Sequence, residues 1–186
     1  SNYKYLQFKT LFDYLSIPLD KLNIYNEYYN YELKKKITIY PHCKEFLIFC
    51  KSKNIRLYCI SNNTSKEQID RINDIGILDV FETIYTSQEF GIEKPDSKLY
   101  NHILGLIHGT NHNTAMIGDS FNNDILGANY IDMFAFWFQE KNTITQNYIQ
   151  FNSYELLLQI FEEYFNKTEL FIDLSHRIGE RFDLVQ

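Results

Sequence analysis

A chain of 186 residues with a net charge of −6 can form one ordinary domain with a small appendage. Its hydrophobic fraction of 45% and charged fraction of 23% are close to globular averages, which excludes a disordered chain. The sequence has no apolar run of about 18 residues and no compensating basic block, so we expect neither a membrane nor a nucleic acid as its partner.

The cysteines bear on the cellular compartment. Cys43, Cys50 and Cys59 are odd in number, fall in segments expected to be buried, and lack the paired spacing of a metal site. No signal peptide is recognisable. We therefore expect reduced thiols and a cytoplasmic protein.

Residues 1–36 are predicted to be helical. Apolar residues recur at helical spacing from Leu6 to Leu15, and the pattern breaks at Ile17-Pro18 before a second helical piece. We expect three units, namely a partial helical appendage at 1–36, a core at 37–165 and a C-terminal extension at 166–186.

From Ile37 onward, predicted strands alternate with predicted helices. Thr64 and Glu67 form the sequence signature of a capping box, and Asp96 can cap a later helix. This alternation is typical of an α/β fold with a doubly wound parallel sheet, whose ligand crevice lies beyond the carboxyl ends of the strands. The predicted strands are 55–60, 83–86, 114–117, 133–138 and a short one near Tyr148, and the predicted helices follow Pro41, Thr64, Asp96, Ser120 and Ser153.

Two short polar motifs fall at loop positions of this pattern. Ser61-Asn62 directly follows the strand ending at Ile60, and Lys94-Pro95 precedes a helix. A hydroxyl with free backbone amides can hold a phosphate oxygen, and a lysine ammonium can neutralise phosphate charge. A helix-capping turn for Ser61-Asn62 and a solvated surface lysine for Lys94 stay open as alternatives.

A third motif, Gly118-Asp119-Ser120, follows the strand 114–117 and continues to Asn123-Asp124. Asp119 and Asp124 are oxygen donors that flank a turn into a helix. Such a pair suits a hard cation such as Mg²⁺, which retains several waters. Helix capping is again the alternative.

In order, context and separation, the three motifs resemble the second, third and fourth motifs of the haloacid dehalogenase-like (HAD) hydrolase superfamily. The matching segments are 57–62, 93–100 and 116–128, and the resemblance covers roughly residues 1–164. It implies a Rossmann-like core in which residues 1–36 are the later part of a helical cap.

The same resemblance implies a role for each candidate residue. Ser61 would hold the transferring phosphoryl group, Asn62 would shape its loop, and Lys94 would bridge nucleophile and phosphate. Asp119 with Asp124 would position Mg²⁺.

The acidic turn favours a phosphatase over the metal-free dehalogenating branch, which usually has a Ser-Ser-Asn type turn there. The implied reaction is Mg²⁺-dependent hydrolysis of a small phosphorylated metabolite through an aspartyl-phosphate. A non-catalytic phosphate-binding or regulatory domain stays open, and a metal-free haloacid dehalogenase is the less favoured alternative.

The nucleophile of such a reaction is missing from the sequence. The family's chemistry begins at a strand ending in Asp-x-Asp, and no Asp-x-Asp occurs here. Asp13 lies inside a helical pattern and is rejected as nucleophile. We expect that the first strand, its loop and the early cap helices, about 40 residues by usual element lengths, are absent. Such a fragment would be inactive alone.

Residues 174–179 and 183–186 resemble the segment just before the phosphate loop of class II aldolase-like domains. This resemblance implies a fused aldolase-like domain and favours sugar phosphates as substrates. An amphipathic terminal helix that ends at Gly179 is the alternative.

Overall fold

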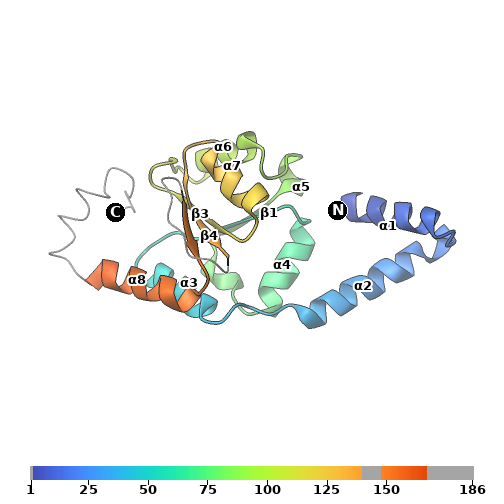
Figure 1. Cartoon of the computed structure of the whole chain (residues 1–186), viewed down its shortest axis with the longest axis horizontal. Helices are drawn as coiled ribbons and strands as arrows, with labels where there is room; N and C mark the ends of the chain where they lie inside the picture. Colours follow the sequence, from blue (N-terminus) through green and yellow to red (C-terminus); the bar gives the residue numbers. More distant parts are fainter. Residues whose placement is uncertain (1, 140–147, 167–186) are drawn as a thin grey trace.

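The computed structural model describes residues 2–139 and 148–166, in which helices alternate with short parallel strands (Figure 1). This confirms the predicted α/β fold class. The aldolase-like resemblance falls on residues outside these ranges. Within them, no helix is both long enough and apolar enough to span a bilayer.

A helical hairpin at the N-terminal end projects from the core (Figure 1). Its helices α1 (Asn2–Tyr14) and α2 (Leu22–Lys36) pack on each other and are joined through the short 3-10 turn η1 (Leu19–Lys21). The rings of Phe12 and Tyr25 meet edge to face with centroids 5.2 Å apart. The two helices predicted on either side of the break at Ile17-Pro18 are therefore both present. That they form a separate unit stays a prediction.

The strands form two hydrogen-bonded groups, and every pair within them is parallel, as expected for this fold class. In one sheet β1 (Tyr58–Ser61) pairs with β2 (Thr83–Thr86). In the other, the order is β3 (Ala115–Gly118), β4 (Phe134–Phe138) and β5 (Tyr148–Phe151). The reason for the division is that no strand among the described residues pairs with the second edge of either β1 or β3.

The second edge of β1 presents backbone groups away from β2. The amide N of Glu82 donates to the carbonyl O of Leu57 on the β2 side, at 2.9 Å. Because peptide groups alternate in direction along a strand, those of Tyr58 and Ile60 face away from β2. Side chains of both sheets, including Ile60 and Met116, still pack on one shared cluster. The two sheets thus belong to one layer, and no strand of residues 2–139 and 148–166 lies between β1 and β3.

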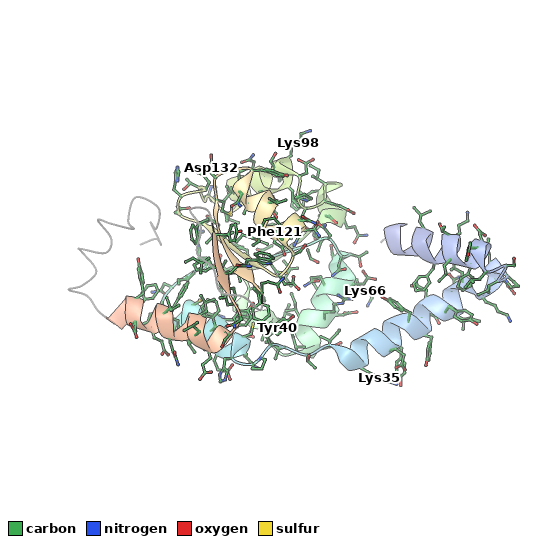
Figure 2. The ribbon with its side chains drawn as sticks, viewed as in Figure 1. Lys35, Tyr40, Lys66, Lys98, Phe121 and Asp132 are labelled. Atoms are coloured by element: carbon green, nitrogen blue, oxygen red, sulfur yellow. The ribbon has the colours of Figure 1, made fainter. Side chains whose placement is uncertain are left out.

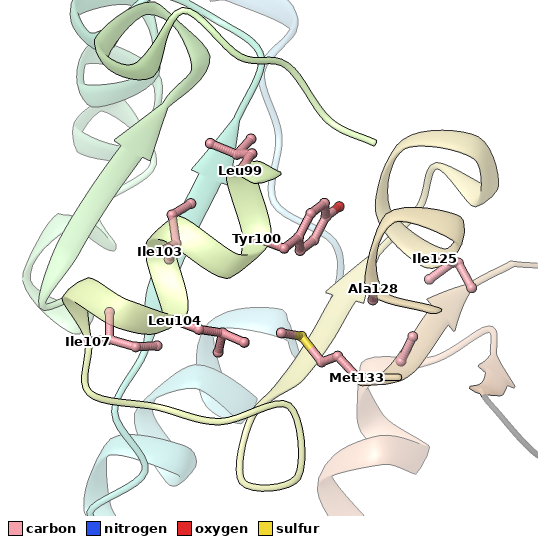
Figure 3. Close-up of a cluster of buried hydrophobic side chains, with 9 residues drawn as sticks. Leu99, Tyr100, Ile103, Leu104, Ile107, Ile125, Ala128 and Met133 are labelled. Carbon is pink, nitrogen blue, oxygen red and sulfur yellow. The ribbon is translucent and has the colours of Figure 1, made fainter. Parts of the chain in front are cut away.

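Helices cover both faces of this layer (Figure 1). On one face, α6 (Ser97–Leu106) contributes buried Leu99, Tyr100 and Ile103 to a cluster with Ile125 and Ala128 (Figure 3). On the opposite face, the helices α3 (Cys43–Ser52) and α8 (Tyr154–Asn166) pack together around a second cluster. The helices of the core are α3 (Cys43–Ser52), α4 (Ser65–Asp74), η2 (Leu78–Val80), α5 (Ser87–Phe90), α6 (Ser97–Leu106), η3 (Phe121–Ile125), α7 (Leu126–Asn129) and α8 (Tyr154–Asn166).

The predicted helix caps are present and fix the loops near the strand ends. Thr64 and Glu67 form the reciprocal capping box at the start of α4. The carboxylate of Asp96 accepts a hydrogen bond from the amide N of Lys98, 2.9 Å away, at the start of α6. These caps set where the polar loops end and the helices begin.

The buried thiols predict how stability depends on alkaline pH. Burial raises the pKa of Cys50 to about 12 and that of Cys43 to about 11, from an ordinary value of 9.0. In the unfolded chain these thiols lose their protons above pH 9 while the folded protein keeps them, so stability is full below pH 9 and is lost as pH rises toward 11. Urea unfolding between pH 7 and 11 should show this fall, with a shallower slope for Cys50→Ala. A free energy of unfolding that stays constant across this pH range would contradict the raised pKa values of Cys43 and Cys50.

Candidate active site

Asn62 joins the loop after β1 to the loop before α6. Its Nδ2 donates to the carbonyl O of Lys94 at 3.1 Å, and its Oδ1 accepts from the amide N of Lys94 at 2.9 Å. One side chain therefore satisfies both backbone polar groups of a residue in the other loop. By these two hydrogen bonds Asn62 fixes the position of the Lys94 backbone relative to the loop after β1.

The ammonium group of Lys94 lies in a buried ion pair. Its Nζ lies 2.6 Å from Asp124 Oδ1 and donates to the carbonyl O of Ile60 at 3.0 Å. The side chains of Lys94 and Asp124 are only 12% and 6% exposed. Lys94 is therefore not a solvated surface lysine, and it connects the end of β1 with the loop after β3. A lysine ammonium has three protons, which leaves one for a ligand.

Ser61 ends β1 and is buried, but its hydroxyl already has partners. The Oγ donates to Gln68 Oε1 at 3.0 Å and accepts from the amide N of Asn63 at 3.1 Å. To donate to a phosphate oxygen, the hydroxyl must turn away from Gln68. The N-cap of α4 is Thr64 and not Ser61 or Asn62.

Gln68 is a site residue that sequence reasoning missed. It lies on α4, and its Oε1 also accepts a hydrogen bond from Asn63 Nδ2 at 2.9 Å. A polar residue in the second turn of an amphipathic helix is ordinary in sequence, so no pattern singled it out. Only the packing of α4 against the end of β1 brings it to Ser61.

The loop from Gly118 to Asp124 has little freedom. Ser120 N donates to Asp124 Oδ2 at 3.1 Å, and the hydroxyl of Tyr100 donates to the carbonyl O of Asn123 at 2.7 Å. Figure 3 shows Tyr100 reaching from α6 toward α7. A Cβ on Gly118 would overlap the side chain of Asp124, so this position requires glycine. The helix predicted here begins as the π turn η3, capped by Ser120.

Asp119 differs from Asp124 in its surroundings. Asp119 is exposed, and no hydrogen bond or ion pair to its carboxylate is found within 2–139 and 148–166. The structure therefore joins Asn62, Lys94 and Asp124 directly and brings Ser61 beside them, while Asp119 is linked only through its loop. No group of three or more His, Cys, Asp or Glu in the described ranges is placed to hold a metal.

By their donor chemistry the two carboxylates nevertheless suit a magnesium ion. Mg²⁺ commonly takes one or two protein carboxylates and keeps several waters, so it does not need a cage of three acids. The Asp119 carboxylate is open to solvent. Asp124 uses one lone pair on each oxygen for Lys94 and Ser120, out of about four lone-pair sites.

Curated proteins similar to this chain include several phosphatases. A glyceraldehyde 3-phosphate phosphatase of Methanothermobacter thermautotrophicus is 35% identical over 96 residues, which is 52% of this chain and 42% of that protein. A ribulose-1,5-bisphosphate 5-phosphatase of Halopiger xanaduensis is 26% identical over 136 residues, 72% of this chain and 56% of that protein. The chain thus spans about half the length of these relatives.

Solved structures share the fold at low sequence identity. The HAD-hydrolase YfnB of Bacillus subtilis, solved bound to magnesium, is 21% identical with a TM-score of 0.65 over 87% of this chain and 83% of that chain. A HAD phosphatase of Thermococcus onnurineus is 21% identical with a TM-score of 0.61 over 72% of this chain and 64% of that chain. The family model for haloacid dehalogenase-like hydrolases matches residues 1–138. The chain belongs to the haloacid dehalogenase-like hydrolase family.

Proposed function

We propose that this chain forms the phosphate- and metal-binding part of a magnesium-dependent phosphatase for small phosphomonoesters. The observation that supports it most is the buried ammonium of Lys94, which Asp124 and Ile60 hold next to Ser61. A fixed cation in this position can neutralise the charge of a phosphate and of the transition state. The names of the sugar-phosphate phosphatases among the relatives favour a sugar phosphate as substrate.

The remaining candidates have complementary tasks in this proposal. Ser61 donates its hydroxyl to a phosphate oxygen after it releases Gln68, and Asn62 keeps Lys94 in place through two hydrogen bonds. Asp119 would be the direct ligand of Mg²⁺, and Asp124, which holds Lys94, would contribute the second carboxylate to the same site. The bound ion would supply charge neutralisation at the phosphate oxygens.

The nucleophile is proposed to lie on a strand that ends in Asp-x-Asp and inserts between β1 and β3, and this sequence contains no Asp-x-Asp. Both edges lack a strand partner among the described residues, and Lys94 lies at the carboxyl end of β1. An aspartate at the end of an inserted parallel strand would therefore face the Lys94 ammonium. Without it, the chain binds phosphate but does not hydrolyse its ester.

Restoring the strand tests this function. An apolar segment ending in Asp-x-Asp is fused ahead of Ser1 through a glycine-serine linker, and phosphate release from sugar phosphates is measured with and without Mg²⁺. We expect turnover only with Mg²⁺, and none from the unfused chain or from a fusion whose first aspartate is asparagine. A folded fusion that binds phosphate without turnover would overturn the catalytic proposal. Halide release that resists a chelator would point to a dehalogenase.

We expect the substitution Asp119→Asn to weaken metal binding without destabilising the fold. Because Asp119 is exposed, we expect the free energy of unfolding to change by less than about 0.5 kcal/mol. The affinity for Mg²⁺, measured by calorimetric titration, should fall at least about tenfold. The matched control is Asp132→Asn, an exposed acid in the left-handed conformation that asparagine also tolerates. Equal Mg²⁺ affinity in both variants would remove Asp119 from the site.

The second candidate is a non-catalytic phosphate-binding domain, and the missing Asp-x-Asp is the observation that favours it. In both readings we propose a core at 37–165 with a partial cap at 1–36. The three free cysteines support a reducing, cytoplasmic compartment. A fused aldolase-like domain after the core stays a prediction.

A further inference from the structure

The only tryptophan of the chain lies directly beside the acidic loop. Trp137 is in β4, where it is the register partner of Gly118, the last residue of β3 before Asp119. Its indole Nε1 donates to the carbonyl O of Asp119 at 3.1 Å. A backbone carbonyl that follows a strand end would otherwise be free to turn with its loop.

The indole ring is itself held by two aromatic neighbours. The centroids of Trp137 and Phe121 are 4.7 Å apart, and those of Trp137 and Tyr148 are 6.0 Å apart. Figure 2 shows Phe121 on the core, away from Lys35 on the projecting hairpin. Since Phe121 begins η3, the indole contacts the loop on both sides of Ser120.

We infer that Trp137 is a positioning residue for Asp119. Its N–H anchors the Asp119 carbonyl, and its ring contacts Phe121 two residues later, so the peptide between Asp119 and Ser120 has a fixed orientation. The exposed Asp119 carboxylate then extends from a backbone that these two contacts hold, so that the metal ligand is preorganised. This inference rests on the proposed Mg²⁺ site and adds a residue that does not touch the ion.

The matched pair of variants is Trp137→Phe and Tyr148→Phe in the full chain. The first keeps an aromatic ring but removes the N–H, and the second keeps the ring that contacts Trp137 and leaves the indole N–H in place. We expect Trp137→Phe to speed hydrogen exchange of the loop amides from Ser120 to Asp124, and Tyr148→Phe to leave it unchanged. Unchanged exchange in Trp137→Phe would overturn the positioning role whether or not metal binds.

The second measurement is Mg²⁺ affinity, followed by calorimetric titration. We expect Trp137→Phe to weaken binding about three- to tenfold, the range for loss of one neutral hydrogen bond. In the unchanged chain, the fluorescence of Trp137 should shift during the titration, and Asp119→Asn should abolish the shift. Faster loop exchange in a protein that binds no Mg²⁺ would refute the metal site and leave the anchoring contact standing. Equal Mg²⁺ affinity in Trp137→Phe and the unchanged chain would refute the inference itself.

Discussion

Lys94→Met is expected to lower the free energy of unfolding by about 3–5 kcal/mol, the range for removing one member of a buried ion pair. The cause is the Asp124 carboxylate, which is 6% exposed and loses the cation that compensates its charge. The carbonyl O of Ile60 loses its donor as well. Urea unfolding followed by circular dichroism measures the effect.

The matched control for this prediction removes both charges. In Lys94→Met combined with Asp124→Asn, the amide oxygen can still accept from the amide N of Ser120, and no unpaired charge remains buried. We expect the double variant to recover part of the lost stability, so that the two substitutions are non-additive. A double variant less stable than Lys94→Met would show that the ion pair is not what stabilises this loop.

Gly118→Ala is expected to cost about 3 kcal/mol and to weaken Mg²⁺ binding together with stability. A Cβ at this position overlaps the Asp124 side chain, so Asp124 must move away from Lys94 and from Ser120 N. Thermal unfolding and calorimetric titration measure the two losses.

Gly105→Ala provides the comparison for this substitution. Gly105 lies in α6 with no atom within 4 Å of the added Cβ, so the same chemical change there should be neutral or stabilising by up to about 1 kcal/mol. If Gly118→Ala were tolerated as well as Gly105→Ala, the close packing of Asp124 over the loop would be refuted.

Helix starts were predicted well from the sequence, because a helix cap involves only residues close together in the chain. The Thr64–Glu67 capping box and the Asp96 cap were legible because a capping side chain bonds backbone groups two or three residues away. Strand ends were displaced by a few residues, as at β1, because hydrogen bonding to β2 rather than composition decides where pairing begins.

The candidate site was predicted in part for a similar reason. Ser61, Asn62, Lys94 and Asp124 stand in short motifs at strand and helix ends, and the resemblance of these motifs to those of the family suggested a common site. The partners of those residues were not predictable. Gln68 and Trp137 come from the middle of a helix and a strand, where polar or aromatic residues are ordinary, and only packing brings them to the loops.

The sequence by itself determined the α/β class, the loops that carry polar residues, and the lack of an Asp-x-Asp nucleophile, because each depends on residues close together in the chain. The tertiary structure alone decided that Lys94 is buried, that it pairs with Asp124 and not with Asp119, and that the layer divides between β1 and β3. These depend on contacts between segments about thirty or more residues apart. Such contacts form only when packing offsets the entropy of closing the intervening loops.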